Sequence, residues 1–190
     1  MEFNIHWAIG CCWIALGLLW LVGAFFSKPT QRSQSMAERS TYIALAAIGI
    51  LFISRLSFHG PWISARFLPD TYSIQLAGFA ITVCGTLFAA WARLTLGSNW
   101  SGRATVKAGH ELIVKGPYAI ARHPIYTGIL LALAGTIVAN AQWRYLEGFA
   151  IIVLALLVKM RQEERLMIET FPQQYPDYRR RVKALVPFVY

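Results

Sequence analysis

Five long apolar segments, separated by polar stretches, run along this chain. The first covers residues 5–26 and is apolar apart from His6, and the others cover residues 41–58, 73–96, 124–139 and 143–160. A helix needs about 20 predominantly apolar residues to cross the hydrocarbon core of a bilayer. At about 1.5 Å per residue, the fourth segment is short for a membrane span, or its flanks lengthen it. The pattern predicts an all-α integral membrane protein with about five transmembrane helices, or four if one short segment is only re-entrant.

Basic residues alternate between the segments that join these helices. They gather in three places: Lys28, Arg32 and Arg39; Arg103, Lys107, Lys115 and Arg122; and Lys159, Arg161, Arg165, Arg179, Arg180, Arg181 and Lys183. The two intervening loops hold only Arg66 and Arg144. The positive-inside rule therefore predicts an amino terminus outside the cell and a cytoplasmic carboxyl terminus. A cleaved signal peptide is not expected, because residues 1–4 carry no positive charge and the apolar run is long.

The composition supports a membrane protein and gives no indication of a nucleic-acid partner. The 190 residues are 56% hydrophobic and 14% charged, with a mean hydropathy of +0.46. The formal net charge of +9 comes from the basic flanks of the predicted helices, so no basic soluble domain is expected to grip phosphates. The three cysteines lie inside apolar segments without metal-type spacing, and no metal site or disulfide is expected.

The chain divides into two regions of different character. Residues 1–96 form an apolar scaffold of three predicted helices, and residues 97–190 hold a polar connector, a two-helix hairpin and a tail. The fifth helix is expected to continue into the cytoplasm through Phe171, because residues 161–169 are rich in helix formers and Pro172 ends the run. The basic, aromatic tail after it either folds back over the hairpin or lies on lipid headgroups.

Charged residues flank the open end of the predicted hairpin. Arg122 and His123 stand directly before Pro124, at the start of the fourth helix, and Glu163 and Glu164 follow the fifth. Helices four and five are antiparallel, so these groups meet at one membrane face. The first N–H groups of the fourth helix favour an anion, and the glutamates accept from an ammonium or from ribose hydroxyls.

Two tyrosines, Tyr118 and Tyr126, add rings to this cluster, and such rings suit cation–π contact with a sulfonium. Acid, base and aromatic groups around one opening match a zwitterionic cofactor that bears a nucleoside. Taken singly, Arg122 also fits a plain membrane anchor, and Glu163 with Glu164 a solvated helix face. Taken together, the groups favour a binding site.

The motifs of this half resemble those of the isoprenylcysteine carboxyl methyltransferase family, whose wider clan includes membrane phospholipid N-methyltransferases. The resemblance covers roughly residues 94–188. Its motifs are His110-Glu-Leu-Ile113, Gly116-Pro-Tyr118, Arg122-His-Pro-Ile-Tyr126, Glu163-Glu164 and, after Phe171, Gln174-Tyr-Pro-Asp-Tyr178.

The resemblance implies a methyltransferase that depends on S-adenosylmethionine and acts at the cytoplasmic face. The residues that it assigns to the cofactor are His110, Leu112, Ile113, Tyr118, His123, Pro124, Tyr126 and Glu163. Arg122 and Lys159 are the predicted catalytic residues. Lys159 stands where the eukaryotic enzymes carry an arginine thought to meet the substrate carboxylate, and lysine keeps the charge but not the bidentate geometry.

The predicted activity is methyl transfer to a lipophilic, membrane-embedded acceptor. A carboxylate acceptor is favoured because it needs no general base, and N-methylation of a phospholipid or amine is the alternative. Two other classes are weighed against this. One is a sterol-reductase-like enzyme that uses NADPH, but such enzymes are much larger than this chain. The other is a non-enzymatic membrane protein, which is expected to bury charges in mid-span. The acceptor's identity and the oligomeric state are left open.

Overall fold

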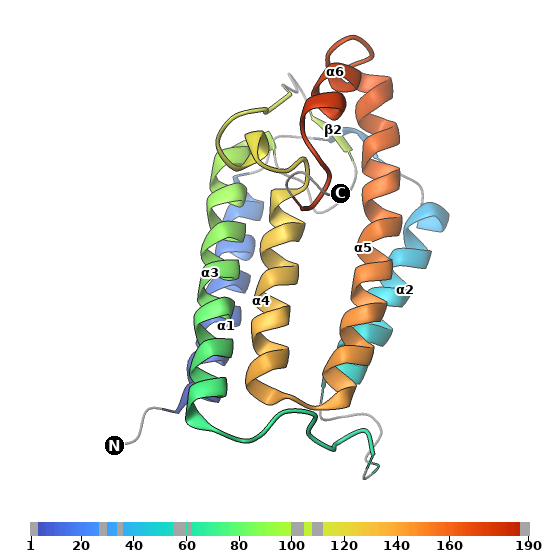
Figure 1. The fold of residues 1–190 in the computed structure, drawn as a ribbon. Helices are drawn as coiled ribbons and strands as arrows, with labels where there is room; N and C mark the ends of the chain where they lie inside the picture. The colour runs from blue at the N-terminus through green and yellow to red at the C-terminus, as the bar shows by residue number, and fades with distance from the viewer. Residues whose placement is uncertain are drawn as a thin grey trace.

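The structure is a computed structural model of the 190-residue chain, and it describes residues 4–26, 30–33, 36–54, 60, 62–99, 105–107 and 112–186. Five long helices form its body: α1 (Ile5–Phe25), α2 (Met36–Ile53), α3 (Tyr72–Leu96), α4 (Pro124–Asn140) and α5 (Trp143–Thr170) (Figure 1). The shorter elements are η1 (Gly97–Asn99), η2 (Gly116–Ala119), α6 (Gln174–Arg181) and the strands β1 (Thr30–Ser33) and β2 (Thr105–Lys107).

Four of the five long helices, α1, α3, α4 and α5, begin where the apolar segments predict them. Asn4 caps α1 and Thr71 caps α3, each accepting a hydrogen bond from a backbone N–H three residues on. The helix α5 continues past the apolar run and stops at Thr170, before Pro172, as predicted. The second helix differs: it begins at Met36 and ends at Ile53, and residues 55–59 lie outside the described part.

Two of these helices, α1 and α3, are long and apolar enough to cross a membrane by length and composition. The apolar stretches Arg39–Ile53 and Pro124–Asn140 are shorter. The helix α5 is long, but its apolar part includes Arg144, Glu147 and Lys159. The all-helical body agrees with a membrane-protein fold, and the number of helices that cross the bilayer stays a prediction.

The helices α3 and α4 pack closely through small residues. Each helix has two glycines seven positions apart, Gly78 and Gly85 on α3 and Gly128 and Gly135 on α4. A Cβ atom on any of them would lie less than 3.0 Å from backbone atoms of the other helix. Small residues of this kind let the backbones of membrane helices approach closely. The pair α3–α4 is therefore closely packed, and α1 packs beside α3.

A second pair of helices, α2 and α5, also packs closely through glycine, with one glycine from each helix. A Cβ atom on Gly49 would lie 2.9 Å from the carbonyl oxygen of Gly148, and one on Gly148 would lie 2.7 Å from that of Gly49. The two groups of helices are joined by the tight turn between α4 and α5 (Figure 1). Ala141 makes this turn in the left-handed region, with φ of 50°.

The strands β1 and β2 pair antiparallel and form a small sheet that the sequence analysis did not predict. They belong to the loop after α1 and the loop after α3, so both basic loops lie at one end of the bundle. The helix α6 and the carboxyl-terminal tail lie at the same end (Figure 1). This grouping agrees with the predicted alternation of the loops. Which membrane face this end occupies stays a prediction.

Candidate active site

The tail docks against the start of α4 through backbone hydrogen bonds. The amide of Arg122 donates to the carbonyl of Lys183 at 2.8 Å, and the amide of His123 donates to the carbonyl of Ala184 at 2.9 Å. The Thr127 hydroxyl donates to the carbonyl of Leu185 at 2.8 Å. The tail therefore folds back over the hairpin, which was one of the two predicted outcomes. These two amides are occupied by the chain itself, so the anion site expected at the start of α4 does not include them.

The helix α6 fixes the turn before α4. Gly116 has a φ of 60°, a conformation that favours glycine, and it opens the short helix η2 that buries Tyr118. The hydroxyl of Tyr178, on α6, donates to the carbonyl of Tyr118 at 2.6 Å. Burial raises the pKa of the Tyr118 phenol, with the charge of Glu163 adding to the effect, so the phenol stays neutral.

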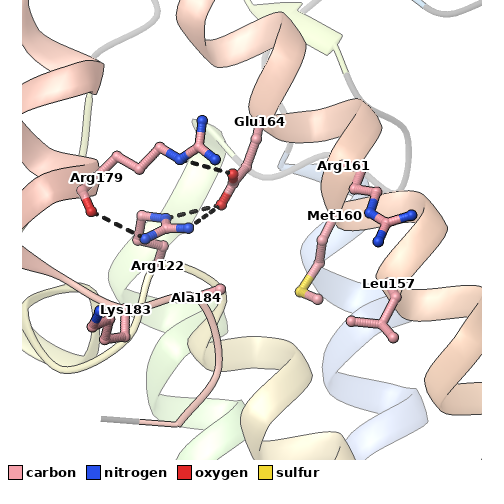
Figure 2. A pocket seen from close by; sticks show the side chains of 8 residues that line it. All are labelled: Arg122, Leu157, Met160, Arg161, Glu164, Arg179, Lys183 and Ala184. Carbon is pink, nitrogen blue, oxygen red and sulfur yellow. Dashed lines mark hydrogen bonds and ion pairs between the residues drawn. The ribbon is translucent and has the colours of Figure 1, made fainter. Parts of the chain in front are cut away.

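Arg122 joins α4, α5 and the tail. Its Nε and Nη2 donate to Oε1 of Glu164 at 2.9 and 2.6 Å, and its Nη1 donates to the carbonyls of Arg179 and Val182. Figure 2 shows the guanidinium held between the Glu164 carboxylate and the tail. Its side chain is only 9% exposed. These contacts give Arg122 an organising role, and its predicted catalytic role stays a prediction.

His123 lies between the two glutamates. Its Nδ1 is 3.6 Å from Oε2 of Glu163, and its Nε2 is 3.3 Å from Oε1 of Glu164. Burial by itself lowers the pKa of this imidazole, but the hydrogen bonds and charges of the two carboxylates outweigh it, and the pKa is raised. The raised pKa favours the protonated ring, which can donate from both nitrogens, one towards each carboxylate.

The same partners lower the pKa of both carboxyl groups. Burial by itself raises the pKa of Glu164, but His123 and Arg122 bring it down to about 2. Burial also opposes ionisation of Glu163, and the hydrogen bond from His123 and the charge of Lys159 outweigh it and lower its pKa. Both groups are therefore carboxylates at neutral pH.

Lys159 lies between two tyrosine rings beside Glu163. Its Nζ is 5.3 Å from the ring centre of Tyr126 and 5.6 Å from that of Tyr42, within cation–π range. It is 3.9 Å from Oε1 of Glu163, which also accepts a hydrogen bond of 2.6 Å from the Tyr126 hydroxyl. Tyr42 comes from α2, and the sequence analysis did not find it. Its position near one end of an apolar segment is the one sequence feature that points to it, and this is a weak signal.

The structure brings most of the predicted site residues into one neighbourhood. Tyr118, His123, Pro124, Tyr126, Glu163, Arg122 and Lys159 lie at the open end of the α4–α5 pair. Ile113 packs on the buried cluster formed by Ala92, Tyr118 and Ile125. Leu112 is half-buried one residue before it. His110 lies outside the described residues.

These residues fit S-adenosylmethionine by their chemistry. The partly buried Glu163 carboxylate is an acceptor for an amino group or ribose hydroxyls. The rings of Tyr126 and Tyr42 already hold a cation, the charge type of a sulfonium. The raised pKa of His123 favours a positive charge, which suits the carboxylate of an amino acid. A mixed-charge, ring-lined cluster of this kind suits a zwitterion better than a purely anionic cofactor.

A pocket of about 350 Å³ opens on the other side of this cluster, between α5 and the tail (Figure 2). Its lining residues are Arg122, Leu157, Met160, Arg161, Glu164, Arg179, Lys183 and Ala184. It shares Arg122 and Glu164 with the motifs described above, but Lys159, Glu163 and Tyr126 do not line it.

Residues 77–169 match the sequence model of the isoprenylcysteine carboxyl methyltransferase (ICMT) family. The Arabidopsis thaliana protein named protein-S-isoprenylcysteine O-methyltransferase B is 28% identical over 79% of this chain and 76% of its own length. Methanethiol S-methyltransferase 1 of Bradyrhizobium diazoefficiens is 26% identical over 86% of this chain and 57% of its own length.

A solved structure of the eukaryotic intramembrane Ras methyltransferase ICMT shares the fold, with a TM-score of 0.56 and 24% identity. The match covers 79% of this chain and 53% of the solved chain, so this chain spans about half the length of that structure.

The matched range includes α4 and the part of α5 that carries Lys159, Glu163 and Glu164, and the helical fold is shared with a membrane methyltransferase of known structure. The family-model match over residues 77–169, the relatives of that name and the shared fold all support the isoprenylcysteine carboxyl methyltransferase family for this chain.

Proposed function

We propose that this protein transfers a methyl group from S-adenosylmethionine to a lipophilic acceptor embedded in the membrane. One observation carries the proposal: a partly buried cluster at the end of a helix pair, in which the Lys159 ammonium lies between two tyrosine rings and beside the Glu163 carboxylate. A soluble acceptor would give no reason to place such a cluster beside apolar helices. The family match supports the same activity.

The residues proposed to hold the cofactor are His110, Leu112, Ile113, Tyr118, His123, Pro124, Tyr126 and Glu163. When bound, S-adenosylmethionine supplies an electrophilic methyl group on a sulfonium. The protein's part is to bind, orient and exclude water, because in-line transfer needs the acceptor close to the methyl carbon. Glu163 would accept hydrogen bonds from the cofactor, and the ring of Tyr126 would stabilise its positive charge.

Lys159 is proposed to hold the acceptor's anionic group. It lies near the end of the apolar part of α5, where a lysine side chain reaches the headgroup level. A carboxylate acceptor needs no general base, which favours O-methylation. A thiolate shares this property, and one relative is named a methanethiol S-methyltransferase, so a sulfur acceptor is the second candidate.

Cofactor choice is tested by calorimetry on the detergent-solubilised protein. We expect S-adenosylmethionine and its demethylated product to bind and NADPH not to bind. Binding of NADPH without binding of S-adenosylmethionine would overturn the methyltransferase proposal in favour of a reductase.

The acceptor side is tested by kinetics of Lys159→Ala with labelled S-adenosylmethionine and a lipid extract. We expect a higher KM for the acceptor or a lower kcat, with cofactor affinity nearly unchanged, and we expect Lys159→Arg to restore most of the loss because the charge is kept. Loss of cofactor binding with unchanged acceptor kinetics would instead place Lys159 in the cofactor pocket.

A further inference from the structure

The pocket between α5 and the tail carries an excess of positive charge. Four cationic side chains line it, Arg122, Arg161, Arg179 and Lys183, against the single carboxylate of Glu164. Glu164 pairs with Arg122 at 2.6 Å and with Arg179 at 3.5 Å. Its charge is thus already shared by two guanidinium groups. The remaining charge favours an anionic guest.

Two of the four cations are available to such a guest. Within the part of the chain that the structure describes, the side chains of Arg161 and Lys183 form no ion pair with an acidic group. Both are exposed at the edge of the pocket, Arg161 on α5 and Lys183 on the tail (Figure 2). They lie on opposite sides of the pocket and come from two separate elements, so the basic rim is not a single charged helix face (Figure 2).

The floor of the pocket is apolar, and it continues along α5. Leu157 and Met160 line the pocket one turn before Arg161 and Glu164. Leu154, three residues earlier and on the same helix face, is 50% exposed. The charged rim and this apolar strip together suit an amphiphile with an anionic head. A free anion would use only the rim.

This pocket is separate from the proposed transfer site. Leu157, Arg161 and Glu164 share one face of α5 through their spacing of four and three residues. Lys159 and Glu163 share another face, directed at Tyr126 and Tyr42, since neighbouring residues of a helix point about 100° apart. Because the two faces diverge, a ligand in this pocket lies beside α5 and the tail and not between α4 and α5.

We propose that the pocket binds the phosphate head of an anionic membrane lipid, with an acyl chain along Leu157 and Leu154. Basic pockets at the ends of membrane helices recognise anionic headgroups in this way, and juxtamembrane cations attract them electrostatically. Arg161 and Lys183 attract the phosphate from opposite sides of the pocket, and Arg179 screens it from Glu164. The site couples the tail to the lipid surface, because Lys183 belongs to the segment whose carbonyls hold the start of α4.

The test is native mass spectrometry of the full chain released from nanodiscs of phosphatidylcholine with and without phosphatidylglycerol. We expect retention of phosphatidylglycerol by the wild type. The double variant Arg161→Gln/Lys183→Gln should lower that retention roughly thirty-fold, since each juxtamembrane cation contributes a several-fold factor. The matched control is Arg165→Gln, which removes one charge from the same helix outside the pocket and should change retention by less than about two-fold.

Two outcomes would overturn the proposal. Equal losses in Arg165→Gln and in either single pocket variant, Arg161→Gln or Lys183→Gln, would mean general attraction to an anionic surface. Binding of inorganic phosphate to the pocket as strong as that of phosphatidylglycerol would mean a site for free anions. Circular dichroism of each variant separates loss of binding from loss of fold. Leu157→Ala provides an independent check, since it should weaken lipid retention and leave phosphate binding unchanged.

Discussion

Helix α4 makes two interfaces of opposite kind. Toward α3 it presents glycines at 128 and 135, and the two backbones are so close that no added carbon atom fits. Toward α5 its first turn presents His123 and Tyr126, which contact carboxylates rather than backbone. The first interface depends on shape and the second on charge.

The difference teaches which changes each side tolerates. On the α3 side the stabilising energy comes from close packing, which is lost when any side chain is enlarged. On the α5 side the stabilising energy comes from ion pairs and hydrogen bonds among partly buried groups, which respond to pH and to loss of a partner. We therefore expect substitutions at the α3 side to act on the fold and those at the α5 side to act on ligand binding.

The largest expected effect is at the α3–α4 interface. Gly85→Ala places a Cβ against the backbone of Ala132 and should lower the free energy of unfolding by about 3 kcal/mol. The matched control is Gly17→Ala, since a Cβ there meets no atom within 4 Å. Thermal melting in detergent measures both. Equal melting temperatures for the two variants would show that the close approach does not matter to stability.

The next effect separates the two glutamates. Glu163→Ala should weaken S-adenosylmethionine binding by about 1.5–3 kcal/mol, the value of a charge-assisted hydrogen bond. Glu164→Ala should weaken it less, because Glu164 faces Arg122 and the tail and not the Tyr126–Lys159 side. Isothermal titration of both variants compares them. Equal and negligible effects would show that the pair is a solvated helix face.

A smaller effect concerns acid stability. Glu164 has a pKa of about 2, below its ordinary value of 4.5, so its stabilising contribution is complete above pH 4.5 and is lost as the pH falls towards 2. With screening at this partly solvated site the loss should be about 1–2 kcal/mol. Between about pH 5 and pH 2, the melting temperature should fall less steeply for Glu164→Gln than for the wild type. Parallel curves would contradict the ion pair's contribution.

The raised pKa of His123 has the opposite sign. Its contribution is present below pH 6.5 and is lost as the pH rises through the higher pKa of the folded state. The same melting experiment, extended to alkaline pH, should show this loss in the wild type and not in His123→Gln.

The smallest effect is at a single hydroxyl. Tyr126→Phe removes the hydrogen bond of 2.6 Å to Glu163 and keeps the ring beside Lys159, so cofactor affinity should fall by about 1 kcal/mol. Tyr145→Phe removes a hydroxyl bond to Asn140 at the opposite end of α4 and should leave affinity unchanged. A larger loss in Tyr145→Phe would mean that both variants act through the fold.

The sequence by itself determined the positions of the long helices and the neighbourhood of the site. Apolar runs of spanning length fold as helices wherever their backbone groups must bond within the segment. Pro124 suits a first helical turn because its missing N–H is not needed there, and Pro172 ends α5 because proline breaks the helix interior. The motifs predicted that Arg122 and His123 would meet the pair Glu163 and Glu164, and the structure confirms this. Their assignment to a cofactor stays a prediction.

Only the tertiary structure decided which partners these residues take. It assigned Glu164 to Arg122 and Glu163 to Tyr126, although two adjacent glutamates look alike in sequence. It also brought Tyr42 to Lys159 and bound the tail carbonyls to the amides before α4. These contacts join segments far apart in the chain, and they depend on the angle at which each helix is packed. Local patterns carry the length and polarity of an element but not its rotation about its own axis.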